Sequence, residues 1–151
     1  MVCMRNLKIL TIDDDMNNLY TLECILEQLD NVEVIQASSA KEGLELIKKI
    51  DIHLILVDIQ MPFMNGFEFV EELNLMQLNE DIPVVFLTAY YKSEEFQAKG
   101  YKLGAFDYMT KPIDEDRLLN KVQLYSKLHH KNELLKEANE KLSVLIAKNE
   151  A

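Results

Sequence analysis

Short apolar runs, many of them β-branched, alternate along this chain with segments whose apolar residues recur every three or four positions. Runs of this length and composition are typical of β-strands. They predict five strands, at 7–12, 32–37, 53–58, 83–88 and 105–110. Positions 54–57 and 84–87 are apolar throughout, as in strands buried on both faces, so these two strands are expected at the centre of a sheet. The run at 32–37 alternates more and suits a place nearer an edge.

The segments between the runs have the spacing of amphipathic helices. Apolar residues at this spacing mark helices at 19–29, 40–50 and 67–73, and a weaker one at 93–103. A last helix is expected to begin at Asp114, a favourable N-cap with acidic residues in the turn that follows. Strands that alternate with helices in this way predict an α/β fold, with a doubly wound parallel sheet and helices on both faces.

Reactive side chains follow four of the predicted strands. The first strand is followed by "DDD" (13–15), the third ends in Asp58, the fourth in "TA" (88–89) and the fifth in "TKP" (110–112). Ligands of open α/β sheets bind beyond the carboxyl ends of the strands. These four strand ends are therefore expected to form one site.

Each of these groups also has an ordinary structural interpretation by itself, as a helix cap, a strand residue or a loop. Together, their electrostatics favour a functional site. The carboxylates of Asp13, Asp14 and Asp58 would repel one another, and Lys111 offsets only part of that charge. A hard divalent cation, with Mg²⁺ as the expected ion, would complete the neutralisation. A carboxylate beside such a cation, a lysine and the hydroxyl of Thr88 can accept a phosphoryl group.

Four blocks of the sequence resemble the signature blocks of the receiver domain of two-component response regulators. They are "KILTIDDD", "LILVDIQMPFMNG", "FLTA" and "GAFDYMTKP", in the family's order and at its usual separations over about residues 6–127. The resemblance implies a flavodoxin-like five-stranded parallel sheet in the order 2-1-3-4-5. It also implies that a phosphohistidine of a sensor kinase or phosphotransfer protein phosphorylates one aspartate of this chain.

Carried over by position, the resemblance makes Asp58 the phosphoacceptor. Asp13 and Asp14 would hold Mg²⁺ together with Asp58 and the backbone carbonyl of Gln60. Lys111 would pair with the phosphoryl group.

The resemblance also implies the parts of a switch. Thr88 would supply the switch hydroxyl and Tyr108 the aromatic ring that moves inward with it, and the Lys111–Pro112 bond would be cis. Gln60 and Tyr90 would flank the phosphoryl group and tune its lifetime, with Tyr90 screening it from water. The alternative for Tyr90 is a solvent-facing loop residue.

Composition and charge narrow the classes of partner. The formal net charge of −10 argues against contact with nucleic acid, and the chain contains no apolar stretch of membrane-spanning length. Cys3 and Cys24 lack a metal-ligand spacing, so reduced thiols in a cytoplasmic protein are expected.

Three other functions are alternatives to a tethered phosphoacceptor. A phosphohydrolase with an aspartyl-phosphate intermediate would need an acid two residues after Asp58, where this chain has Gln60, so we expect no enzyme acting on external substrates. A nucleotide- or flavin-binding protein would need a Gly-rich loop in place of "DDDMNN". The third alternative, a receiver without a tethered output domain that acts by binding a separate partner protein, stays open.

The last helix is expected to continue beyond the receiver. Apolar residues keep a spacing of three, four and seven to near the end of the chain, at Leu124, Leu128, Leu135, Ala138, Leu142 and Leu145. The resemblance implies a receiver domain at 1–127. The stripe beyond it predicts a coiled-coil linker at 128–151 that forms a homodimer and leads to an output domain beyond residue 151. The alternative is a frayed, partly helical tail.

Overall fold

The computed structural model describes residues 6–78, 82–89, 98–99, 102 and 107–149. Among these residues, five parallel strands form one sheet in the order β2-β1-β3-β4-β5. The strands are β1 (Leu7–Ile12), β2 (Val32–Ala37), β3 (Leu54–Asp58), β4 (Val84–Thr88) and β5 (Asp107–Thr110). The predicted fold class and strand order are confirmed, and the continuously apolar runs do form the buried strands β3 and β4.

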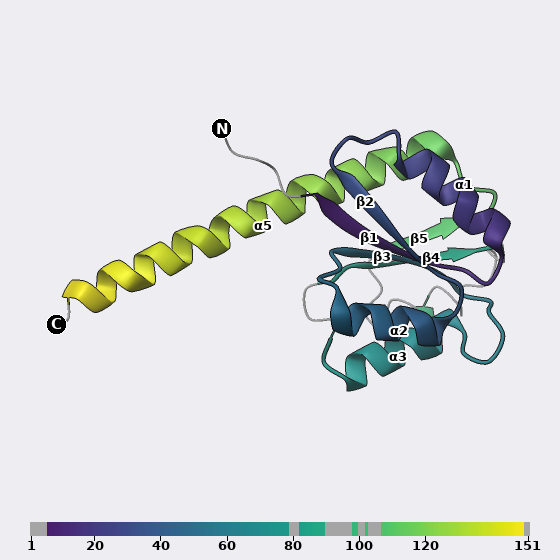
Figure 1. The fold of residues 1–151 in the computed structure, drawn as a ribbon, viewed down its shortest axis with the longest axis horizontal. Coiled ribbons are helices and arrows are strands. Elements are labelled where there is room, and N and C mark those ends of the chain that lie inside the picture. The colour runs from purple at the N-terminus through teal and green to yellow at the C-terminus, as the bar shows by residue number, and fades with distance from the viewer. Residues whose placement is uncertain (1–5, 79–81, 90–97, 100–101, 103–106, 150–151) are drawn as a thin grey trace.

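Helices cover both faces of the sheet, as Figure 1 shows. They are α1 (Met16–Leu26), α2 (Ala40–Lys49), α3 (Gly66–Leu75) and α5 (Glu115–Asn149). α1 and the first part of α5 lie on one face, and α2 and α3 lie on the other (Figure 1). The helix predicted at 93–103 falls mostly outside the described residues. Within this range the structure describes only 98–99 and 102, and these residues are helical.

Two apolar cores follow from this arrangement, because alternate residues of each strand face opposite helices. Leu10 and Ile12 of β1 pack toward α2 and α3, whereas Leu7 and Ile9 pack toward α1 and α5. Phe86 of β4 anchors the first core, with its ring centroid 5.1 Å from that of Phe67 on α3. The sheet is thus buried on both faces, and its carboxyl edge is held at a fixed place.

The helix starts are fixed by side-chain caps next to that edge. Asp15 caps α1 by accepting from the Asn17 N–H, and Ser39 caps α2. α3 begins with a capping box, in which Asn65 and Glu68 each accept the other's backbone N–H. Such caps satisfy the free N–H groups of the first turn and define where each loop ends.

α5 extends far beyond the sheet (Figure 1). Its buried residues are Leu118, Val122 and Tyr125. One turn further on, His129 stacks on His53 with ring centroids 4.1 Å apart. His53 is itself fixed, because its Nδ1 accepts the Lys8 N–H at 2.9 Å. This histidine contact, which the sequence did not predict, joins α5 to the amino-terminal edge of the sheet.

α5 passes residue 127 without a break, so the predicted division into domain and linker stays a prediction. The described part of the chain contains no helix with both the length and the apolar character needed to cross a membrane.

Candidate functional site

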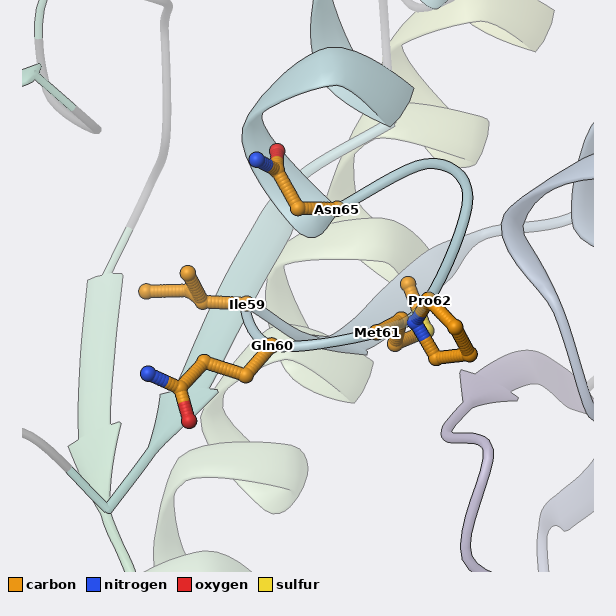
Figure 2. A pocket seen from close by; sticks show the side chains of 5 residues that line it. All are labelled: Ile59, Gln60, Met61, Pro62 and Asn65. Carbon is orange, nitrogen blue, oxygen red and sulfur yellow. The ribbon is translucent and has the colours of Figure 1, made fainter.

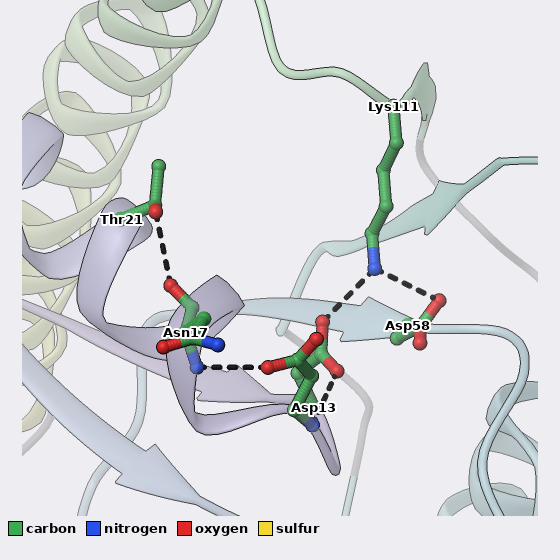
Figure 3. Close-up of polar contacts among 6 residues, drawn as sticks. Asp13, Asn17, Thr21, Asp58 and Lys111 are labelled. Carbon is green, nitrogen blue, oxygen red and sulfur yellow. Dashed lines mark hydrogen bonds and ion pairs between the residues drawn. The ribbon is translucent and has the colours of Figure 1, made fainter.

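The carboxyl ends of β1, β3 and β5 place three charged side chains together at one edge of the sheet. Asp13 follows β1, Asp58 ends β3, and Lys111 follows β5. The Lys111 Nζ lies 3.0 Å from Asp13 Oδ2 and 3.4 Å from Asp58 Oδ1. Figure 3 shows the lysine extending to both carboxylates. The predicted convergence of these residues is therefore observed.

Asp13 and Asp58 are buried although both side chains are ionisable, with 1% and 7% of their surfaces exposed. Asp13 is held by the backbone on both sides. Its Oδ1 accepts the Asp15 N–H at 2.9 Å, and its own N–H donates to the carbonyl of Ala37 at 3.2 Å. This use of the Asp15 N–H was not predicted from the sequence, although an acidic run before a helix is a usual signal for such turns.

Burial governs the protonation of Asp58. It raises the pKa of Asp58 to about 6, and the charge of Asp13 adds to the rise, while Lys111 and the Gln60 N–H act against it. Burial alone would lower the pKa of Lys111, but the carboxylates of Asp13 and Asp58 outweigh it and raise that pKa above its usual value. The site thus contains a carboxylate whose charge is only partly compensated.

The three predicted metal ligands lie close enough to share one ion. One carboxylate oxygen from each of Asp13, Asp14 and Asp58 can be chosen so that all three lie within 4.8 Å of one another. An all-oxygen donor set with one exposed member, Asp14, is the kind that binds Mg²⁺ and leaves some of its waters in place. The residues therefore fit the ion that the sequence predicted.

The loop after Asp58 is fixed by a close approach of two backbone segments. The Gly66 N–H donates to the carbonyl of Ile59 at 2.9 Å. A Cβ at Gly66 would lie 2.7 Å from the Asp58 carbonyl oxygen, so a side chain has no room there. Ile59, Gln60, Met61, Pro62 and Asn65 line a surface pocket of about 420 Å³ beside the site (Figure 2). The backbone N–H of Gln60 donates to Asp58, and the predicted roles of Gln60 as a metal ligand and in phosphoryl lifetime stay predictions.

The predicted switch residues lie on the neighbouring strands. Thr88 is buried at the end of β4, and its carbonyl accepts the Lys111 N–H at 2.8 Å. The Lys111–Pro112 bond is cis, as predicted. Tyr108 is already buried, with its ring centroid 5.6 Å from that of Phe86. Tyr90 lies outside the described residues, so its predicted role stays a prediction.

Comparison with known proteins identifies the family. Residues 9–123 match the model of the response regulator receiver domain. The chain belongs to this family. The match begins within β1, covers β2 to β5, and includes all four of the strand ends that the sequence singled out.

Relatives of this receiver differ in length. The chain is 36% identical to an uncharacterized response regulatory protein of Vibrio cholerae over 84% of its own residues, but it spans only 52% of that relative. It is 33% identical to protein PilH of Pseudomonas aeruginosa, with 76% of this chain and 93% of PilH covered. Some relatives are thus little longer than a receiver, and others carry a further region.

The fold is also that of solved receivers. The structure of the chemotaxis protein CheY4 of Vibrio cholerae matches with a TM-score of 0.73 at 28% identity, covering 80% of this chain and 98% of that one. This chain is therefore similar to two-component receivers in both sequence and fold.

Proposed function

We propose that Asp58 accepts a phosphoryl group from the phosphohistidine of a sensor kinase or phosphotransfer protein. The observation that carries the proposal is a buried aspartate at a strand end, 3.4 Å from a lysine ammonium and clustered with two further carboxylates. An aspartate that served only the fold would be costly in this place, because its charge is largely removed from water. Within a receiver family, the same arrangement is that of a phosphoacceptor.

The chemistry follows from the positions of these groups. A carboxylate oxygen of Asp58 attacks phosphorus, so that a P–O bond forms while the P–N bond to the donor imidazole breaks. The bonding electron pair of the P–N bond stays on the imidazole nitrogen. Lys111, which already contacts Asp58, balances charge on the phosphoryl oxygens, and the Thr88 hydroxyl donates to one of them. Asp13, Asp14, Asp58 and the Gln60 carbonyl would hold Mg²⁺, which supplies further charge balance when bound.

The proposed switch acts through the strand ends. As Thr88 moves toward the phosphoryl group, Tyr108 is held in its inward position. The face formed by the helix predicted at 93–103, β5 and α5 then shifts to a second arrangement, which alters the pairing of the C-terminal helices. The burial of the Tyr108 ring against Phe86 supports an inward position that the fold can accommodate. A ligand or modification moves such an equilibrium only by its difference in affinity between the two states. We propose no activity toward external substrates, because Gln60 replaces the acid that a phosphohydrolase would need.

Intact mass spectrometry after incubation with acetyl phosphate and Mg²⁺ tests the phosphoacceptor. The wild-type chain is expected to gain one phosphoryl group and to lose that adduct slowly. Asp58→Asn is expected to gain none, because its amide is not a nucleophile toward phosphorus. An adduct of equal yield on Asp58→Asn would contradict the assignment of the site.

The second part of the proposal concerns the far half of α5, which pairs with a second copy and leads to a tethered output domain. Large apolar side chains beyond the sheet are exposed, among them Leu128, Leu135, Leu142 and Leu145. Their spacing of seven and three places them on one stripe. A stripe of this kind is normally buried against another helix.

Light scattering coupled to size-exclusion chromatography tests the pairing. The 17.5 kDa chain is expected to elute as a dimer, and Leu135→Lys with Leu142→Lys is expected to elute as a monomer, since two buried charges oppose pairing. Ser143→Lys with Ala147→Lys adds the same charge away from the stripe and is expected to stay dimeric. A monomeric wild type, or equal behaviour of both variants, would leave α5 without a pairing role.

A further inference from the structure

Phe63 has an unusual position in the loop between β3 and α3. Its side chain is fully exposed, and its backbone has a φ of 69°. The Met64 N–H donates to the Pro62 carbonyl at 2.8 Å and closes a three-residue turn around Phe63. A left-handed φ is uncommon for residues other than glycine, and a bulky aromatic residue in it is an outlier. Glycine would form this turn without strain and without an exposed ring.

The ring of Phe63 does not contribute to the apolar cores. A fully exposed ring buries no surface in either core. Strained residues persist where the surrounding structure holds them, and they gather at functional sites. Here both ends of the loop are held, by the Gly66–Ile59 hydrogen bond and by the capping box of Asn65. The loop therefore presents the ring to solvent from a rigid base.

The location of Phe63 relates it to the acceptor. It lies five residues after Asp58, and residues of the same turn line the pocket of Figure 2. Met16, which is 64% exposed, begins α1 directly after the acidic run. Exposed apolar side chains thus occur next to both acidic segments of the site, one in the loop after β3 and one at the start of α1.

We propose that Phe63 is a specificity-determining contact for the protein that donates the phosphoryl group, and that it packs on an apolar patch of that protein. This inference rests on the proposed function of Asp58. Because Asp58 is only 7% exposed, a donor protein must bring its phosphohistidine down to a recessed carboxylate. Its surface then covers the rim of the site, which includes the loop that carries Phe63.

Charge explains why an apolar contact is useful there. The chain carries a net charge of −10, which a Mg²⁺ ion held by Asp13, Asp14 and Asp58 would offset only in part. The approach of a phosphorylated protein to this edge is opposed by charge at long range. An aromatic ring supplies attraction that charge does not reduce, and aromatic residues are frequent among the dominant contacts of interfaces. A small donor such as acetyl phosphate reaches Asp58 without covering the ring.

Comparing two kinds of phosphoryl donor tests this inference. The protein donor is the autophosphorylated cytoplasmic part of the source organism's sensor kinase that transfers fastest to the wild-type chain. For Phe63→Ala, kcat/KM from this donor is expected to fall about tenfold or more. The rate with acetyl phosphate is expected to stay within about twofold, because the ring takes no part in the chemistry. Phe63→Met, which keeps an apolar side chain, is expected to recover part of the loss.

Leu75→Ala is the matched control, because Leu75 is also an exposed apolar residue, at the far end of α3. It is expected to leave both rates unchanged. An equal fall with both donors would mean that Phe63 acts through the shape of the acceptor loop, and unchanged rates with both would mean that it has no role; either overturns the inference. Failure of the wild type to react with acetyl phosphate would instead refute the proposed function. If the wild type reacted with acetyl phosphate but accepted a phosphoryl group from none of the sensor kinases, both the protein donor and this contact would be overturned.

Discussion

In the absence of metal ions, Asp58→Asn is expected to raise the free energy of unfolding at pH 8 by about 1–2 kcal/mol. The reason is the burial of an incompletely compensated carboxylate, which raises the pKa of Asp58 to about 6. Asparagine has nearly the same shape and carries no charge. Lys111 keeps Asp13 as its partner at 3.0 Å, so the substitution leaves no ammonium group unpaired.

The sign of this effect sets its pH dependence. An unfolded aspartate has a pKa of about 3.9, so between about pH 4 and pH 6 the folded state binds more protons at Asp58 than the unfolded state. The stability of the wild type therefore falls through this range relative to that of Asp58→Asn. The difference between the two proteins is expected to grow from pH 4 to pH 7 and then to stay constant.

Urea denaturation in a chelating buffer at several pH values measures the difference. Asp30→Asn, which removes an exposed carboxylate far from the site, is the control and is expected to change little. Adding Mg²⁺ is expected to stabilise the wild type, because an ion that binds only the folded state raises its stability. The gain should be smaller for Asp58→Asn, which lacks one ligand. A variant less stable than the wild type at pH 8 would show that burial of this charge is not costly.

Gly66→Ala is expected to destabilise the protein by about 2–3 kcal/mol and to slow phosphorylation. The new Cβ would lie 2.7 Å from the Asp58 carbonyl oxygen and 2.9 Å from the Ile59 Cα. Both atoms belong to backbone that is fixed by β3 and by the Gly66–Ile59 hydrogen bond. To make room, the chain must shift at the acceptor itself, so stability and reactivity are expected to fall together.

Gly43→Ala provides a matched control on α2. The closest atom to a Cβ there is the Ile12 Cδ1, at 2.6 Å, which is the end of a flexible side chain. This side chain can rotate, and alanine favours a helix interior over glycine by about 1 kcal/mol, so the net change is expected to be small. Thermal unfolding and the rate of adduct formation with acetyl phosphate measure both variants. Equal losses in the two proteins would show that the contact beside Asp58 has no special rigidity.

Much of the architecture could be predicted from local pattern. The burial of β3 and β4 could be predicted because both strands are apolar at every position before their last residue. A run of that kind is stable only between two layers of helices. The location of the site could be predicted for a related reason. Parallel strands bring their carboxyl ends to one edge, so charged residues that follow several strands must meet there. Asp13, Asp58 and Lys111 meet as expected, with no knowledge of the intervening loops.

Other features depend on contacts that no local pattern encodes. The stacking of His53 on His129 joins residues far apart in the chain, and it depends on the angle at which α5 crosses the sheet. The raised pKa of Asp58 depends on how completely the surrounding loops exclude water. The turn at Phe63 could not be predicted. A left-handed φ is usually signalled by glycine, and here the residue that adopts it is a phenylalanine.

The sequence by itself determined which of the described strands and helices form, the order of the reactive groups along them and the edge at which those groups gather. It could do so because hydrophobic period and strand direction are properties of neighbouring residues. Only the tertiary structure decided how closely Gly66 approaches Asp58, how deeply that carboxylate is buried and where α5 leaves the sheet. These are distances between segments separated along the chain, and they are fixed by packing of the whole domain.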